Sequence, residues 1–217
     1  KQRMLNAYRG EWSDRAPVAP EFWYYYPAKL LGVDMIEFER EVPFHLALKQ
    51  TFEAFDCEGW GAAFGAIPNP QVTRRSEERW NDEGRLEVRS TTVTPAGSLT
   101  SATVYDRQEP SWTLERPIKD LERDLPAYEM ATLADPEGLD PAPMVRAWEE
   151  VGESYLLEAW LGVPFFDYFA EGREGGFAVA IYDLMEQEKL LLTLRERYQE
   201  YVIRLARVIC ERTPLES

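Results

Sequence analysis

Cysteine, histidine and long apolar runs are scarce in this 217-residue chain, which has two cysteines and one histidine. Cys57 and Cys210 lie far apart and form no CxxC pattern, so we expect reduced thiols rather than a disulfide framework. No apolar run approaches the roughly 18–20 residues that a transmembrane helix needs. Residues 1–10 also lack the apolar core of a signal peptide. These absences predict a cytoplasmic protein.

Positive charge is scarce as well: 24 Lys and Arg residues stand against 39 Asp and Glu residues, giving a net charge of -15. A nucleic-acid-binding protein normally needs a basic surface to neutralise phosphates, so DNA or RNA is not expected as a partner. The same argument disfavours an anionic membrane surface. Hydrophobic residues make up 45% of the chain, which predicts a folded protein, and the length fits a single domain over residues 1–217.

The most informative stretch begins at residues 155–161, an apolar run with Glu158 as its one interior charge. Such a run is typical of a strand that is buried on both faces of a parallel sheet. It ends at Gly162 and Pro164, and the aromatic residues 165–169 follow on a short helix or loop. Because α/β proteins place their chemistry just past the carboxyl ends of parallel strands, this segment predicts both a fold class and a site.

Other segments extend the same pattern. Residues 58–64 are small and apolar and predict a second inner strand, and residues 16–19 predict a short strand near the N-terminus. Residues 71–106 carry turn clusters between runs rich in Thr, Val and Arg, which predicts a small antiparallel insertion. Helices are expected between the strands, so the fold class is α/β with a mainly parallel sheet. The expected helices cover residues 4–10, 27–32, 43–55, 121–130, 140–151, 177–185 and 190–209.

Three short segments share motifs with one superfamily. The first, residues 5–18, contains Arg-Gly-Glu and then Asp-Arg-Ala-Pro-Val. The second, residues 114–121, reads Leu-Glu-Arg-Pro-Ile-Lys-Asp-Leu. The third, residues 162–172, contains Gly-Val-Pro-Phe and then Tyr-Phe-Ala-Glu-Gly. In this order they resemble the uroporphyrinogen decarboxylase superfamily, which includes the decarboxylase and the cobamide-dependent methyltransferases. The resemblance implies a (β/α)8 barrel of the TIM-barrel type. Since such a barrel needs about 250 residues, this chain is expected to be its incomplete N-terminal portion.

The chain departs from the decarboxylase at two places. Residues 21–26 stand where the decarboxylase has an arginine motif that binds substrate carboxylates, and residues 61–64 stand where it has an aspartate. A polycarboxylate substrate would therefore lose its bidentate partners. Tyr168 matches the one active-site position that is retained. These differences favour a corrinoid-linked methyltransferase that acts on a small methyl donor or acceptor; the alternatives are decarboxylation of a tetrapyrrole or related substrate, and a non-catalytic binding or accessory subunit.

The resemblance also implies cofactors and partners. In the methyltransferase branch, a His-x-Cys pair and a later Cys hold zinc, but this chain has only His45 and no such spacing. No metal site is therefore expected in this chain; zinc would come from a missing C-terminal half, and a partner protein would carry the corrinoid. An incomplete barrel exposes strand edges and apolar helix faces, which predicts self-association or pairing with a complementary chain.

Three residues are candidates for catalysis. Asp167 and Tyr168 follow the buried strand and could act as an acid/base pair, although Asp167 could equally cap the next helix. Glu21 is the first charge after the N-terminal strand and could orient a substrate, or could be an ordinary surface carboxylate. Glu158 interrupts an apolar strand, so its carboxylate must be paired or protonated.

Aromatic residues are the candidates for binding a flat ligand. They follow the two predicted strand ends and could form a stacking wall for a tetrapyrrole, a corrinoid or another small molecule. The upstream group could instead plug one end of the barrel beneath its helices. The candidate ligand-binding residues are Phe22, Trp23, Tyr24, Phe165 and Phe166.

Overall fold

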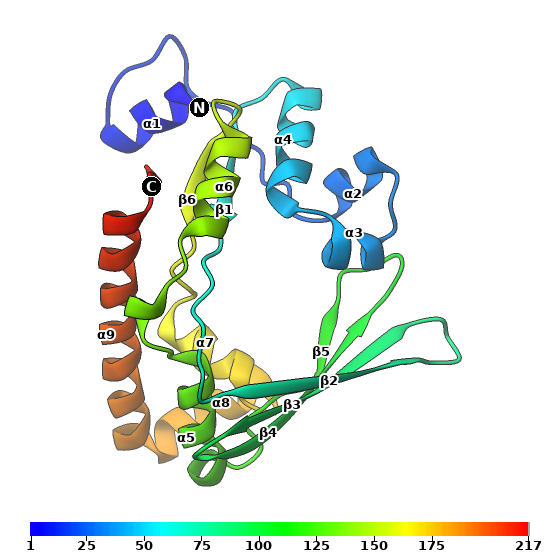
Figure 1. Ribbon diagram of the computed structural model, residues 1–217, viewed down its shortest axis with the longest axis vertical. Helices are drawn as coiled ribbons and strands as arrows, with labels where there is room; N and C mark the ends of the chain where they lie inside the picture. The colour runs from blue at the N-terminus through cyan, green and yellow to red at the C-terminus, as the bar shows by residue number, and fades with distance from the viewer. Residues whose placement is uncertain (217) are drawn as a thin grey trace.

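The computed structural model describes residues 1–216, which form a mixed α/β fold with one parallel and one antiparallel sheet, neither of them closed into a barrel (Figure 1). The strands are β1 (Trp60–Ala63), β2 (Thr73–Trp80), β3 (Leu86–Thr94), β4 (Gly97–Tyr105), β5 (Trp112–Glu115) and β6 (Leu156–Ala159). The helices are α1 (Gln2–Arg9), α2 (Tyr25–Leu31), α3 (Met35–Glu41), α4 (Phe44–Phe55), α5 (Leu121–Thr132), the 3-10 helix η1 (Pro136–Gly138), α6 (Ala142–Val151), α7 (Phe165–Gly172), α8 (Gly176–Glu186) and α9 (Glu188–Arg212).

The two predicted inner strands are confirmed, and they pair with each other. β1 and β6 run parallel, with Trp60 opposite Leu156 and Ala63 opposite Ala159. Leu156 is fully buried, because both α1 and the neighbouring strand β1 pack against it. The first part of the apolar run, residues 155–157, is thus buried on both faces, whereas Trp160 near its end is 41% exposed.

The strand predicted at residues 16–19 does not form, and the segment is irregular. Pro17 and Pro20 lack the N–H groups that a ladder needs at those positions. The backbone N–H of Val18 instead donates to the carboxylate of Glu58, at 2.9 Å. The parallel sheet therefore has two strands within the described residues, and the expected TIM barrel is not confirmed.

The antiparallel insertion predicted at residues 71–106 is confirmed and is larger than expected. Its strands pair in the order β2-β3-β4-β5, so β5 adds a fourth strand beyond residue 106. The register shifts between Ala102 and Thr103, where β5 joins β4. Leu99 of β4 packs with Leu121 and Leu125 of α5, whereas β2 is exposed along its whole length. α5 thus anchors the sheet, and α3 contacts it as well, since the backbone N–H of Met35 donates to the carbonyl of Arg107 in the loop before β5, at 3.0 Å (Figure 1).

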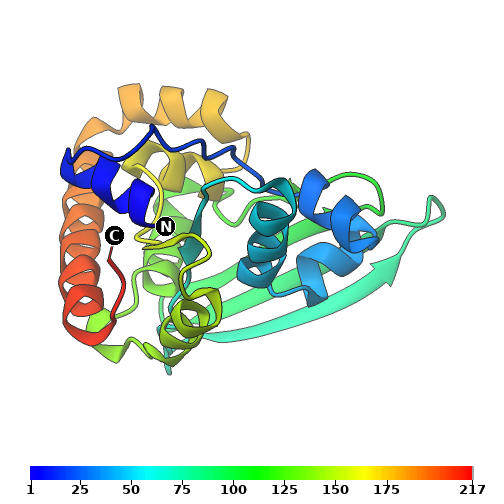
Figure 2. The ribbon, with the colours of Figure 1, turned by 90° about the horizontal axis from the view of Figure 1, so that it is seen from above.

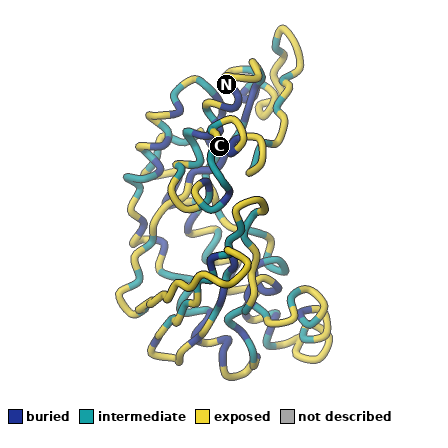
Figure 3. The backbone as a smooth tube through the Cα atoms, turned by 90° about the vertical axis from the view of Figure 1, so that its right-hand side faces the viewer, coloured by how far each residue is buried: buried dark blue, intermediate teal, exposed yellow. Residues whose placement is uncertain are grey.

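The long helix α9 connects the two large clusters of buried side chains. Leu191 and Leu194 lie in the cluster with α5, α7 and α8, and Leu205 and Val208 lie in the cluster around the parallel strands. Buried stretches of chain run through the inside of the molecule, with exposed stretches on its outer loops (Figure 3). In the part of the chain that the structure describes, no helix combines the length and the apolar character needed to cross a membrane.

Candidate functional site

A cavity of about 350 Å³ opens at the carboxyl ends of β1 and β6. Phe64 follows β1 and Trp160 follows β6, so both strands deliver an aromatic side chain to the same edge of the sheet. α5, α7 and α9 supply most of the remaining wall. We call this cavity the tyrosine chamber, after the residues that distinguish its lining: Tyr128, Thr132, Tyr168, Tyr198 and Tyr201.

Tyr168, the residue that the motif predicted, lies in the wall of this chamber. Its ring stacks on Tyr198 with centroids 4.4 Å apart, and the ring of Tyr128 lies 5.2 Å away. Its hydroxyl shares a hydrogen bond with the Thr132 hydroxyl, at 2.7 Å. Burial raises the pKa of both Tyr168 and Tyr128. The chamber therefore presents neutral phenols, whose rings can stack on a ligand. The hydroxyls of Tyr128 and Tyr198 donate to the backbone carbonyls of Tyr168 and Val163.

The turn that leads from β6 into α7 explains the Gly-x-Pro motif. Gly162 has a φ of 116°, which side-chain-bearing residues rarely adopt. A Cβ atom at this position would lie 2.8 Å from the hydroxyl of Tyr198. That hydroxyl donates to the carbonyl of Val163, so the glycine lets α9 approach the turn closely. Pro164 then precedes the first turn of α7.

Phe64 and Trp160 form the mouth of the chamber. Their ring centroids are 5.8 Å apart, and the two residues are 53% and 41% exposed. Glu171 is the one charged residue among those that line the chamber, and none of the described residues in its wall is Lys or Arg. The lining is therefore aromatic and carries no positive charge.

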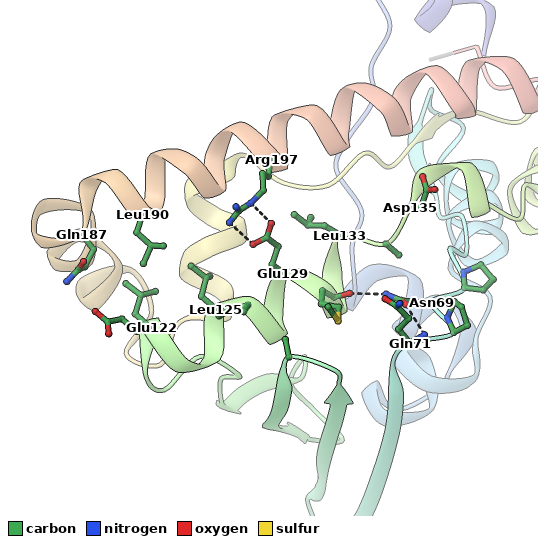
Figure 4. Close-up of a pocket in the computed structure, with 17 residues that line it drawn as sticks. Asn69, Gln71, Glu122, Leu125, Glu129, Leu133, Asp135, Gln187, Leu190 and Arg197 are labelled. Carbon is green, nitrogen blue, oxygen red and sulfur yellow. Dashed lines mark hydrogen bonds and ion pairs between the residues drawn. The ribbon is translucent and has the colours of Figure 1, made fainter.

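A larger outer groove of about 1010 Å³ adjoins the chamber at Leu133, which lines both (Figure 4). An ion pair between Arg197 of α9 and Glu129 of α5 crosses it, with Arg197 Nη2 2.8 Å from the carboxylate. Asn69 donates to the carbonyl of Met130 at 2.9 Å and so holds the segment after β1 against α5. Leu133 thus stands between the groove and the chamber.

The other predicted residues of α7 have different surroundings. Phe165 packs on Tyr198, with centroids 6.1 Å apart, and supports the chamber from behind. Phe166 packs on Phe177 of α8, at 5.7 Å. Asp167 is half-buried in the first turn of α7, where a helix N-terminus stabilises a carboxylate, and it is not part of the chamber wall. The structure thus places Tyr168 in the chamber and Asp167 outside it.

The upstream candidates lie at the opposite end of β1. Trp23 stacks on Phe44 at 5.7 Å and meets the edge of Trp60, the first residue of β1. The space left there is only about 10 Å³, which is less than a water molecule needs. The aromatic run therefore packs against α4, and the structure does not bring it together with Tyr168. Four predicted residues share this location: Glu21, Phe22, Trp23 and Tyr24.

Glu158, the charge inside the predicted strand, is half-buried and accepts a hydrogen bond from the Tyr8 hydroxyl of α1. This bond raises the pKa of Tyr8 to about 12. The carboxylate is thus paired, and it helps hold α1 on the parallel strands.

Most of the chamber was not anticipated from the sequence. Tyr198 belongs to the predicted apolar stripe of residues 190–209, and Tyr201 lies on the same helix; a helical period assigns such residues to the core. Tyr128 and Thr132 lie on α5, and nothing in the sequence indicates that this helix, rather than another, packs beside the parallel strands. A signal that could have indicated these residues is the recurrence of tyrosine and threonine, which have polar ends, at buried helical positions.

High pH provides a first test of the chamber. Burial raises the pKa of Tyr128, Tyr155 and Tyr168, whereas unfolded tyrosine ionises near about 10. A raised folded pKa means that the stabilising contribution is complete below about pH 10 and declines above it. We expect the free energy of unfolding of the wild type to fall steeply above that pH. The free energy of unfolding of the Tyr168→Phe variant should fall less steeply. Denaturation followed by circular dichroism, with phenolate absorbance recorded in parallel, measures this; ionisation of all tyrosines well before unfolding would contradict it.

Among residues 1–216, no group of three or more His, Cys, Asp or Glu side chains is arranged to hold a metal ion. The one histidine, His45, has its Nε2 atom 2.6 Å from the carboxylate of Glu150. Cys57 and Cys210 are free thiols. The described residues therefore do not make up the zinc site that the resemblance implies for the methyltransferase branch.

Comparisons of the chain with protein-family models, with curated proteins and with solved structures find no match in any of the three. A function for this chain has to be inferred from its motifs and from the geometry of the chamber.

Proposed function

We propose that the tyrosine chamber binds a small, uncharged organic molecule that carries a methyl group on a heteroatom, and that the chain contributes to corrinoid-linked methyl transfer. The two parallel strands would belong to a (β/α)8 barrel of the uroporphyrinogen decarboxylase type. One observation carries this proposal: the Gly-x-Pro turn places Tyr168 in an aromatic cavity at the carboxyl ends of two parallel strands.

The size and charge of the chamber select the substrate class. Its volume of about 350 Å³ lies at the lower end of the roughly 300–1,000 Å³ of small-molecule sites. A tetrapyrrole is too large for it. A polycarboxylate would also meet Glu171 and no opposing guanidinium or ammonium group in the lining. These properties favour a small neutral molecule over a tetrapyrrole to be decarboxylated.

The residues of the chamber can perform two tasks in such a reaction. The aromatic walls stack on the substrate and exclude water from it. The Thr132 hydroxyl donates to the carbonyl of Tyr128, so Tyr168, which holds its proton because burial raises its pKa, donates to Thr132. Redirected from Thr132 to the heteroatom, this proton would stabilise the negative charge that develops there. A corrinoid carried by a partner protein would supply the cobalt that accepts the methyl group.

Ligand binding at the mouth of the chamber is the direct test. Phe64→Ala removes one wall of the mouth, and Phe55→Ala is a matched control, since both residues are 53% exposed and both pack on another aromatic ring. In titrations of tryptophan fluorescence with methoxybenzene, we expect Phe64→Ala to weaken binding about five- to tenfold. Phe55→Ala should bind like the wild type. Absence of saturable binding, or an equal loss in both variants, would overturn the proposal.

Methyl transfer is tested separately from binding. The chain is mixed with the bound methyl donor and reduced free cobalamin, and the absorbance change on methylation of cobalt is followed. We expect Tyr168→Phe to retain donor binding but to slow this change by about tenfold or more. Binding without any methylation would leave the small-molecule site in place and refute the reaction.

A further inference from the structure

Helix α8 exposes apolar side chains on most of its surface. Ala180 is the one residue of this helix that is buried, whereas Tyr182 is 65% exposed and Met185 is 76% exposed. Figure 2 shows α8 at the outer edge of the molecule. We call its exposed apolar surface the α8 face, which consists of Phe177, Ala178, Ile181, Tyr182, Leu184 and Met185.

Polar contacts hold α8 in a defined orientation while this face points outward. Arg173 Nε lies 2.5 Å from the carboxylate of Asp183, and both side chains are largely buried. The same guanidinium donates to the carbonyl of Lys119, at 2.8 Å. Phe177 also packs on Phe166 of α7. α8 is therefore a fixed platform whose apolar face no other described part of the chain covers.

We propose that a second copy of this chain covers the α8 face, with the two α8 helices packed antiparallel about a two-fold axis near Ile181. The exposed portions of the five largest side chains amount to roughly 600 Å² on typical side-chain areas. Two copies would thus bury about 1,200 Å², which is the lower limit for a stable protein interface. Such an interface is self-complementary, as two-fold symmetry requires.

The helix dipole favours the antiparallel arrangement. Arg116 and Glu174 border the N-terminal end of α8, and Glu186, Glu188 and Lys189 lie at the C-terminal end. Both ends thus carry both signs, and the side-chain charges do not select an orientation. Antiparallel packing places the positive N-terminal end of each α8 beside the negative C-terminal end of the second copy.

The rest of the molecule does not favour association, because the net charge of -15 repels a second copy. Apolar burial on the α8 face has to outweigh this repulsion. Salt should therefore raise the affinity, since it screens the repulsion between the two acidic copies.

The oligomeric state tests the proposal, with Ile181→Glu as the disruptive variant. Ile203→Glu is the control, because Ile203 of α9 is 54% exposed and Ile181 is 50% exposed, so both add one acidic group to a surface isoleucine. Light scattering and sedimentation at micromolar concentration should give a dimer for the wild type and for Ile203→Glu. Ile181→Glu should weaken dimerisation by about 30-fold or more. A monomeric wild type, or equal dissociation of both variants, would overturn the proposal.

A cross-link tests the arrangement of the two helices. In a background with Cys57 and Cys210 replaced by serine, Ile181→Cys lies near the proposed axis and should form an intermolecular disulfide on mild oxidation. Ile203→Cys should not. A dimer that cross-links through Ile203→Cys and not through Ile181→Cys would show that another surface is used. Neither experiment depends on ligand binding to the tyrosine chamber.

Discussion

Replacement of Glu58 by Ala is expected to lower the free energy of unfolding by about 2–4 kcal/mol at pH 7. Glu58 is 6% exposed, and its carboxylate lies 2.6 Å from Arg3 Nη1 and 2.7 Å from Arg15 Nη2. It also accepts the backbone N–H of Val18. One side chain thus joins α1, the irregular segment after it and the start of β1. Its removal leaves two guanidinium groups and an N–H group without this partner.

The effect should depend on pH in a defined direction. Burial by itself would raise the pKa of Glu58, but hydrogen bonds from Val18, Arg3 and Arg15 outweigh it and lower the pKa to about 2. Unfolded glutamate ionises near about 4.3. Because the folded pKa is the lower one, the contribution is complete above about pH 4.3 and is lost as the pH falls toward about 2. Urea denaturation of wild type and Glu58→Gln across this window should give curves that converge at low pH.

Asp14→Asn is the control for this prediction. Asp14 pairs with Arg3 as Glu58 does, with Arg3 Nε 2.7 Å from its carboxylate, but its side chain is 66% exposed. An exposed pair contributes little to stability, so this variant should unfold almost like the wild type. If both substitutions cost the same free energy, burial of Glu58 is not the cause.

The parallel strands and most helices could be predicted because local sequence determines them. The apolar run at residues 155–161 predicts a covered strand, and the first half of β6 has that cover. The same reasoning failed at residues 16–19, where Pro17 and the following Pro20 have no N–H to donate to a ladder. There a tertiary contact, the carboxylate of Glu58, satisfies Val18 in place of a strand. Helix α3 was not predicted either, although Asp34 caps it by accepting the N–H of Glu37.

Only the part of the site that belongs to a sequence motif could be predicted. Tyr168 was identified through the Gly-x-Pro turn, and the structure places it in the chamber. Local sequence does not reveal whether an aromatic run lines a cavity or fills one. Trp23 fills its site against Phe44, whereas Tyr198 lines a cavity, although both belong to apolar patterns. The difference depends on which helices meet, and that is a tertiary property.

Gly162→Ala is expected to lower the free energy of unfolding by about 2–3 kcal/mol and to weaken ligand binding by about tenfold. Two costs add at this position. The φ of 116° is strained for any residue with a side chain, and the added Cβ would lie 2.8 Å from the Tyr198 hydroxyl. Relief of this contact moves Tyr198, which stacks on Tyr168 and donates to the carbonyl of Val163. The wall of the chamber must therefore shift with it.

Gly84→Ala separates the two costs. Gly84 has a φ of 77°, but a Cβ atom there would meet nothing within 4 Å. This variant should lose only the backbone cost of about 1–2 kcal/mol and should keep wild-type affinity for methoxybenzene. Thermal denaturation and fluorescence titration of both variants measure the two effects. If Gly162→Ala loses stability but retains full affinity, the turn supports the fold without shaping the chamber. A loss of affinity well beyond that of Gly84→Ala would link the Gly-x-Pro motif to ligand binding through Tyr198.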